Sequence, residues 1–183
     1  MQVTKTEIPG VLIITPQRIV DPRGFFSETF RAAQYAAAGM PHPFVQDNWS
    51  RSRRGVLRGL HLQNPKAQGK LVTVISGQVL DVAVDVRVGS PAFGRHVAVE
   101  LSDENGIQLY MPRGCAHGFI VLSETADFLY KCDEYYSPQD EIVVRWNDPA
   151  LGIDWRISEP LLGKRDAAAP LLADVSDLPS FDA

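Results

Sequence analysis

The chain has 183 residues, 18 Lys and Arg against 22 Asp and Glu, and a formal net charge of −4 at pH 7. This length allows one domain with a full hydrophobic core, and 45% hydrophobic residues is ordinary for a globular protein. The acidic balance argues against general nucleic-acid binding, which usually shows a basic surplus. We therefore expect a single domain over residues 1–183.

The sequence contains no apolar run near the ~20 residues that a membrane-spanning helix requires. The first residues also lack the basic and apolar regions of a signal peptide, so we expect a cytoplasmic protein. The two cysteines, Cys115 and Cys132, are too far apart for a CxxC motif and are expected to be reduced structural thiols.

The first forty residues predict short strands followed by one helix. Strands are expected at 11–14 and 25–30, separated by the turn sequence Asp-Pro-Arg-Gly at 21–24. Residues 31–38 are rich in alanine and predict the only good helix. Thr29 is expected to cap this helix, and Gly39 with Pro41 to end it.

From residue 45 onward the pattern is that of short strands. They are predicted at 71–75, 79–88, 97–101, 107–111, 119–122, 128–131 and 142–146, with turn residues between them. In 79–88, Val82, Val84, Val86 and Val88 alternate with Asp81, Ala83, Asp85 and Arg87, which predicts an apolar and a polar face. Strands at this spacing favour a sandwich or barrel. Residues 147–183 lack periodicity and contain four prolines, so we expect a tail that wraps the domain or a partner subunit.

A basic stretch at residues 46–63 stands out in this acidic chain. It holds four arginines (Arg51, Arg53, Arg54, Arg58) and His61, one of only four histidines. Arginines beside an imidazole suit an anionic substrate from which a proton is removed. The alternative is a solvated loop before a strand with a structural histidine. We interpret Arg51, Arg53 and Arg54 as solvated charges.

A second pattern, Gly106 followed by Pro112, Gly114 and His117, resembles the second motif of the cupin superfamily. The first cupin motif would supply His-x-His and then Glu as metal ligands. Here the matching place reads His61-Leu62-Gln63 with no Glu soon after. Because a first-row metal site normally needs three or more such ligands, metal binding is disfavoured.

Within the cupins the chain resembles the dTDP-4-dehydrorhamnose 3,5-epimerase family over nearly its whole length. Eight segments carry the resemblance, in order: 21–26 with Glu28, 46–48, 55–61, 68–70, 81–87, 112–119, 130–131 and 164–166. The resemblance implies a mainly β, jelly-roll barrel with a short N-terminal helix and an irregular or helical C-terminal tail. It also implies inversion at C3 and C5 of dTDP-4-dehydro-6-deoxy-D-glucose, with neither metal nor cofactor.

The chemistry explains the catalytic residue types that the resemblance implies. The C4 ketone acidifies the neighbouring C–H bonds, so inversion needs a base on one face of the sugar and an acid on the other. His61 is the expected base, because its ordinary pKa near ~6.5 suits neutral pH. Asp166 is its partner by family match, with Asp81 as a second possibility. Tyr130 is the expected acid at C5, and Lys70 is expected to stabilise the enolate.

The resemblance further implies a set of substrate-binding residues: Arg23, Phe26, Glu28, Gln46, Asp47, Asn48, Arg58, His117, Tyr136, Glu141 and Arg165. Arg58 and Arg23 are the expected phosphate contacts, and Tyr136 or Phe26 is expected to stack on thymine. His117 is either near the sugar or a satisfied core histidine.

In the family, Arg23, Phe26 and Glu28 come from the neighbouring subunit, which implies a homodimer with an exchanged N-terminal strand. The chain departs from the common family pattern at Trp49, where many relatives carry His, and at Arg165, where Lys is common. Neither change removes a group that the reaction requires.

Three other functions stay open. One is an epimerase that inverts only C3 or only C5 of another deoxysugar. Another is a cupin that binds a sugar nucleotide without turnover. The third, a metal-dependent cupin oxygenase, would require a metal to co-purify and chelators to inhibit.

Overall fold

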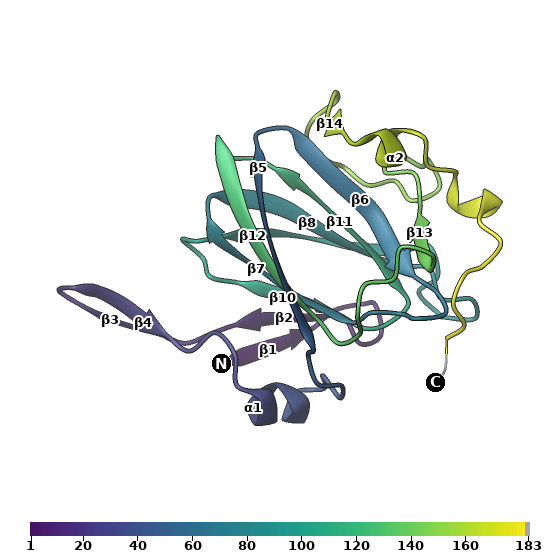
Figure 1. Ribbon diagram of the computed structural model, residues 1–183. Coiled ribbons are helices and arrows are strands. Elements are labelled where there is room, and N and C mark those ends of the chain that lie inside the picture. Colours follow the sequence, from purple (N-terminus) through teal and green to yellow (C-terminus); the bar gives the residue numbers. More distant parts are fainter. Residues whose placement is uncertain (182–183) are drawn as a thin grey trace.

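The structure, a computed structural model, describes residues 1–181. Two sheets face each other (Figure 1). The first has the order β1 (Gln2–Lys5), β2 (Leu12–Thr15), β10 (Gln108–Met111), β7 (Lys70–Ser76), β12 (Thr125–Cys132) and β5 (Gln46–Arg53). The second has the order β13 (Glu141–Val143), β6 (Val56–Gln63), β11 (Cys115–Val121), β8 (Gln78–Asp85) and β9 (His96–Ser102), and β14 (Leu161–Leu162) pairs in parallel with β6. The mainly β, jelly-roll fold predicted from the sequence is confirmed.

The space between the sheets is divided between a hydrophobic core and a cavity. The core is built from inward side chains of both sheets, including Val72 of β7, Leu109 of β10 and Val121 of β11, each with 0% exposure. Burial of such side chains is the main source of stability in a two-sheet fold.

The outer face of the second sheet is covered by the C-terminal segment. Leu151, Trp155 and Leu172 pack there against a row of outward aliphatic side chains that includes Val82 and Val84 of β8. This segment contains β14, α2 (Lys164–Ala167) and the 3-10 turn η1 (Leu172–Asp174), and it runs past β6 in Figure 1. The expectation that the tail wraps its own domain is confirmed.

This packing corrects the interpretation of residues 79–88. The strand ends at Asp85, and its side chains are buried on both faces, because the Asp-bearing face points between the sheets and the Val-bearing face lies under the tail. Val88, expected on the apolar face, is 55% exposed, whereas Arg87, expected on the polar face, is buried in an ion pair with Asp85.

Helix α1 (Ala32–Ala37) lies below the first sheet and is one residue shorter at each end than predicted. Its buried Tyr35 packs beside β2 and β10. The expected Thr29 cap is wrong, because Arg31 occupies the N-cap and no side chain caps the helix. The Thr29 carbonyl instead accepts a hydrogen bond from the Tyr35 hydroxyl at 2.7 Å.

Strands β3 (Arg18–Asp21) and β4 (Gly24–Ser27) form a hairpin that projects from the barrel (Figure 1). The predicted turn at 21–24 is confirmed, but the strand ends at Ser27 rather than at residue 30. The hairpin exposes large apolar side chains, Val20 at 76% and Phe26 at 69%. The predicted strand at 142–146 is likewise shorter, since β13 stops at Val143.

No helix among residues 1–181 is long and apolar enough to cross a membrane.

Candidate active site

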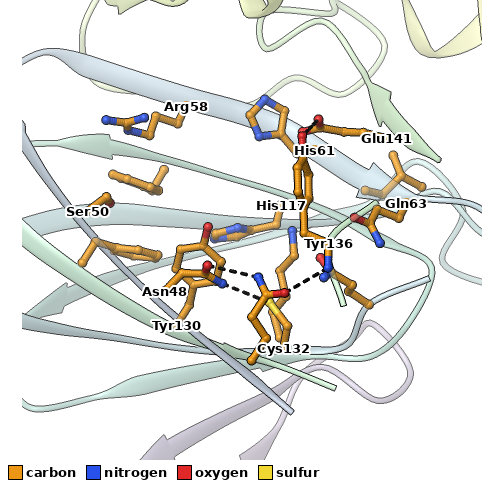
Figure 2. Close-up of a pocket in the computed structure, with 16 residues that line it drawn as sticks. Asn48, Ser50, Arg58, His61, Gln63, His117, Tyr130, Cys132, Tyr136 and Glu141 are labelled. Atoms are coloured by element: carbon orange, nitrogen blue, oxygen red, sulfur yellow. Dashed lines mark hydrogen bonds between the residues drawn. The ribbon is translucent and has the colours of Figure 1, made fainter. Parts of the chain in front are cut away.

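A cavity of about 330 Å³ opens between the sheets at the end of the core. Figure 2 shows the side chains that surround it. It is lined by Gln46, Asn48 and Ser50 of β5, Arg58, His61, Leu62 and Gln63 of β6, Gln68 and Lys70, His117 and Phe119 of β11, Phe128, Tyr130 and Cys132 of β12, Tyr136 and Glu141. Nine of the predicted site residues lie in this lining, and Asp166 contacts one of them.

An irregularity in β6 places both Arg58 and His61 in the cavity. Residues three apart on a regular strand point to opposite faces, but the pairing of β6 with β11 shifts between His61 and Arg58. Gly59 lies at the shift with φ +118°, and a Cβ there would meet the His117 carbonyl oxygen at 2.5 Å. Only glycine therefore fits this position, and the bulge brings a cation and an imidazole to one face.

His61 is held by a carboxylate from the C-terminal tail. Its Nε2 lies 2.7 Å from Asp166 Oδ1, and the side chains are 30% and 8% exposed. Asp166 belongs to the short helix α2, which lies beside β6. The imidazole thus reaches the cavity while its partner stays sheltered, which suits a base whose charged form needs stabilising.

Tyr130 and Lys70 come from the opposite wall, on β12 and β7. Burial raises the pKa of Tyr130, so its hydroxyl keeps its proton at neutral pH. Burial lowers the pKa of Lys70, an effect opposed by the nearby Cys132, Glu141 and Asp81. A proton donor and a cation therefore face the His61–Asp166 pair.

A polar cluster connects the rim of the cavity to the tail. The Tyr136 hydroxyl donates to Glu141 Oε2 at 2.6 Å, and Arg165 Nη1 lies 2.7 Å from the same oxygen. Burial alone would raise the pKa of Glu141, but these two contacts outweigh it and leave the pKa below its usual value. Because Arg165 precedes Asp166, the cluster also ties α2 to the barrel beside His61.

The side chains on β5 continue this polar lining. Gln46 donates from Nε2 to Asn48 Oδ1 at 3.0 Å, and its Oε1 accepts the backbone N–H of Tyr136 at 3.0 Å. The guanidinium of Arg58 is held by Ser52 Oγ through Nε and Nη2 at 3.2 and 3.1 Å. Since Ser52 is uncharged, the positive charge of Arg58 stays available to an anion.

Four predicted binding residues lie elsewhere in the subunit. Asp47 points to the outer face of β5, where its carboxylate contacts Lys131 Nζ at 3.0 Å. Arg23 and Phe26 lie on the projecting hairpin, and Arg23 is paired with Asp21. Glu28 follows the hairpin and is paired with Arg31. These four are not brought to the cavity of their own chain.

The structure also adds cavity residues that sequence reasoning missed: Ser50, Leu62, Gln63, Gln68, Phe119, Phe128 and Cys132. Alternation along β5 from Gln46 and Asn48 would have found Ser50. Phe119 of β11 and Phe128 of β12 could not be found in that way, because these strands belong to different sheets and meet only in the folded structure. Phe119 and Phe128 stack with ring centroids 4.1 Å apart and an interplanar angle of 11°.

Asp81, the second possibility as partner of His61, pairs with the other cavity histidine. Its Oδ2 lies 2.9 Å from His117 Nε2. The expectation for His61 is therefore corrected in favour of Asp166 alone, because the register of β8 and β11 sets Asp81 opposite Phe119, within reach of His117. Within residues 1–181, no group of three or more His, Cys, Asp or Glu side chains is placed to hold a metal ion.

A family model for dTDP-4-dehydrorhamnose 3,5-epimerase matches residues 5–174 of the chain. The chain belongs to this family. The dTDP-4-dehydrorhamnose 3,5-epimerase of Salmonella typhimurium is 53% identical over 175 residues, which cover 94% of this chain and 96% of that protein.

Two solved structures of this family bear on the cavity. The epimerase RmlC of Legionella pneumophila, solved with dTDP-4-keto-L-rhamnose, matches with a TM-score of 0.97 and 49% identity, covering 100% of this chain and 99% of that one. ChmJ of Streptomyces bikiniensis, a 3′-monoepimerase solved with dTDP-quinovose, matches with a TM-score of 0.89 and 38% identity, covering 96% and 91%.

Proposed function

We propose that the chain is a 3,5-epimerase that converts dTDP-4-dehydro-6-deoxy-D-glucose to dTDP-4-dehydro-L-rhamnose, as a single domain and without metal or cofactor. The observation that carries this proposal is the cavity between the sheets, where the His61–Asp166 pair faces Tyr130 and Lys70. Base, acid and cation are the three groups that inversion beside a ketone requires.

The first step at each carbon is proton removal by His61. The imidazole takes the C–H proton α to the C4 ketone, and the electron pair moves onto the C4 oxygen as an enolate. Asp166 holds the ring by its Nε2 and stabilises the imidazolium that forms. The 2.7 Å contact and the partial exposure of His61 support this role.

The second step is proton return to the opposite face of the same carbon. Tyr130, on the far wall, donates at C5, and its raised pKa keeps the proton in place until the enolate collapses. Lys70 places positive charge near the C4 oxygen while negative charge develops there. Burial strengthens this interaction, because fewer water molecules screen it.

The nucleotide is bound at the rim by charge and by aromatic contact. Arg58 and Arg165 suit the diphosphate, since one guanidinium group can donate two parallel hydrogen bonds to two oxygens of a phosphate. Tyr136 suits the thymine ring. Gln46, Asn48, Glu141 and His117 complete the polar contacts.

We also propose that the active protein is a homodimer in which the β3–β4 hairpin is exchanged. In support, the hairpin projects away from its own barrel and exposes Val20 and Phe26 at 76% and 69%. Exposed apolar surface of this kind usually marks an interface. Arg23, Phe26 and Glu28 would then complete the partner's cavity. A cytoplasmic location stays a prediction.

The test is proton NMR of the keto sugar nucleotide with the purified protein in D2O, with and without EDTA. The proposal expects deuterium at both C3 and C5, conversion to dTDP-4-dehydro-L-rhamnose, and no effect of EDTA on the rate. Deuterium at one carbon only would favour a mono-epimerase such as the related ChmJ. Binding without any exchange would favour a sugar-nucleotide-binding cupin, and loss of activity in EDTA would favour a metal enzyme.

A further inference from the structure

Asp81 has a carboxylate that the fold does not fully satisfy. The residue is 0% exposed, and its Oδ2 contacts His117 Nε2 at 2.9 Å. Its Oδ1 is the one buried side-chain nitrogen or oxygen of residues 1–181 that lacks a hydrogen-bond partner. A buried charged oxygen without a partner costs stability, so the fold alone gives no reason for an aspartate here.

Asp85, four residues further along β8, shows what a structural carboxylate looks like in this barrel. It is also 0% exposed, but its oxygens accept from the Arg87 guanidinium, the Arg87 backbone N–H and the Ser90 hydroxyl. Asp81 has only His117. The comparison indicates that Asp81 serves the cavity rather than the core.

The His117 ring is fixed in place by its surroundings. It stacks on Phe128 with centroids 5.9 Å apart and an interplanar angle of 20°. Its backbone pairs directly with that of His61, so the two histidines are neighbours across β6 and β11. Nδ1 makes no hydrogen bond within the described residues and is not among their fully buried unpaired atoms, which leaves it facing the cavity.

Lys70 lines the same cavity and forms no ion pair within residues 1–181. Burial lowers its pKa, and Cys132, Glu141 and Asp81 oppose that change. The other charged or titratable groups on the cavity wall are Arg58, His61, His117, Tyr130 and Tyr136. Glu141 and Asp81 are thus the carboxylates whose charge opposes the effect of burial on the pKa of Lys70, the one lysine in the cavity lining.

We propose that Asp81 is a positioning residue that acts through His117. Its carboxylate holds the His117 proton on Nε2, so that Nδ1 presents a lone pair to a hydroxyl of the bound sugar. This inference rests on the proposed epimerase function of the cavity.

The test uses Asp81→Asn, which keeps the shape of the side chain and removes its charge. The asparagine amide can donate as well as accept, so it no longer fixes the His117 tautomer. We expect kcat to fall roughly 100-fold, in the range that positioned acid–base groups contribute. The alkaline limb of the kcat profile should move to lower pH, because Lys70 loses a negative neighbour.

Stability and spectroscopy separate positioning from folding. The thermal midpoint of Asp81→Asn should stay level or rise, because the variant removes a buried charge whose Oδ1 lacks a partner, while the asparagine oxygen can still accept from His117 Nε2. The ¹⁵N spectrum of His117 should change from a single Nε2–H tautomer to a mixture. A double-mutant cycle tests the link to His117. In the His117→Gln background, Asp81→Asn should cause no further fall in kcat and should only move the alkaline limb of the kcat profile, through its effect on Lys70.

Asp127→Asn is the matched control, because Asp127 contacts Arg51 and Trp49 on the outer side of β12, away from the cavity. It should keep the wild-type kcat and pH profile. The proposal is overturned if Asp81→Asn keeps the wild-type kcat and His117 spectrum, or if its loss of activity follows a fall in thermal midpoint. Failure of the wild-type protein to exchange deuterium would instead break the proposed function, while the ¹⁵N change would still report the link between Asp81 and His117.

Discussion

Two histidine–aspartate pairs lie side by side across β6 and β11, and they differ in burial and origin. In the first pair the His61 and Asp166 side chains are 30% and 8% exposed, and the aspartate comes from the C-terminal tail. In the second, His117 and Asp81 are 9% and 0% exposed, and the aspartate comes from the adjacent strand β8.

This difference in burial separates two tasks. A base that removes and returns protons must reach the substrate and pass through a charged state, which partial exposure makes easier. A deeply buried pair meets less of the substrate and instead keeps a fixed arrangement of donors and acceptors. The same two residue types therefore suit proton transfer in one place and orientation in the other.

Removing the base of the exposed pair should have the largest effect. His61→Ala is expected to abolish deuterium exchange at both C3 and C5, a loss of about 10³- to 10⁴-fold in kcat. NMR in D2O measures exchange at each carbon separately. Full exchange in this variant would contradict the assignment of His61, and His42→Ala, which changes an exposed histidine outside the cavity lining, is the control.

Removing the acid Tyr130, which lies opposite that pair, should affect the reactions at C3 and C5 to different extents. Tyr130→Phe deletes the hydroxyl and keeps the ring that lies 6.0 Å from Phe128. We expect net conversion at C5 to fall about 10²-fold while exchange at C3 is largely spared. The ratio of the two NMR signals checks this, and equal, mild losses at both carbons would count against the acid role.

The pH dependence of kcat should report the ammonium of Lys70, which lines the same cavity as His61 and His117. Burial lowers the pKa of Lys70, so its ammonium is lost at a pH below the ordinary value of about 10.4, and kcat should fall there. Lys70→Arg carries a charge that does not titrate in this range, so its residual activity should lack that alkaline limb. A limb that persists unchanged in Lys70→Arg would assign it to another group.

The smallest effect should come from loosening the tail that carries Asp166. Glu141→Gln keeps the shape of the side chain but weakens its contact with Arg165, which holds α2 beside His61. We expect a loss of about tenfold in kcat/KM, comparable to one charge-assisted hydrogen bond. Glu134→Gln, whose carboxylate lies 3.9 Å from Arg113 outside the cavity lining, should have no such effect.

Most of the barrel could be predicted, because short-range patterns determine strands. Alternation and turn residues located the strands from residue 71 to residue 131, although β11 and β12 begin earlier than expected. The errors fall where long-range contacts act, as in β8. Its alternation predicted one apolar and one polar face, whereas the packing of two sheets and the tail buries both faces.

The candidate site was likewise predictable in part from the sequence and in part only from the tertiary structure. The resemblance to the epimerase family, together with residue type, indicated a base at His61, an acid at Tyr130, a cation at Lys70 and a phosphate-binding arginine at Arg58. It gave Asp166 as the carboxylate partner of His61, with Asp81 as a second possibility. Tertiary structure decided which aspartate meets which histidine. Asp166 reaches His61 across 105 positions of sequence because the tail lies along β6, whereas Asp81 meets His117 because β8 pairs with β11 in one particular register.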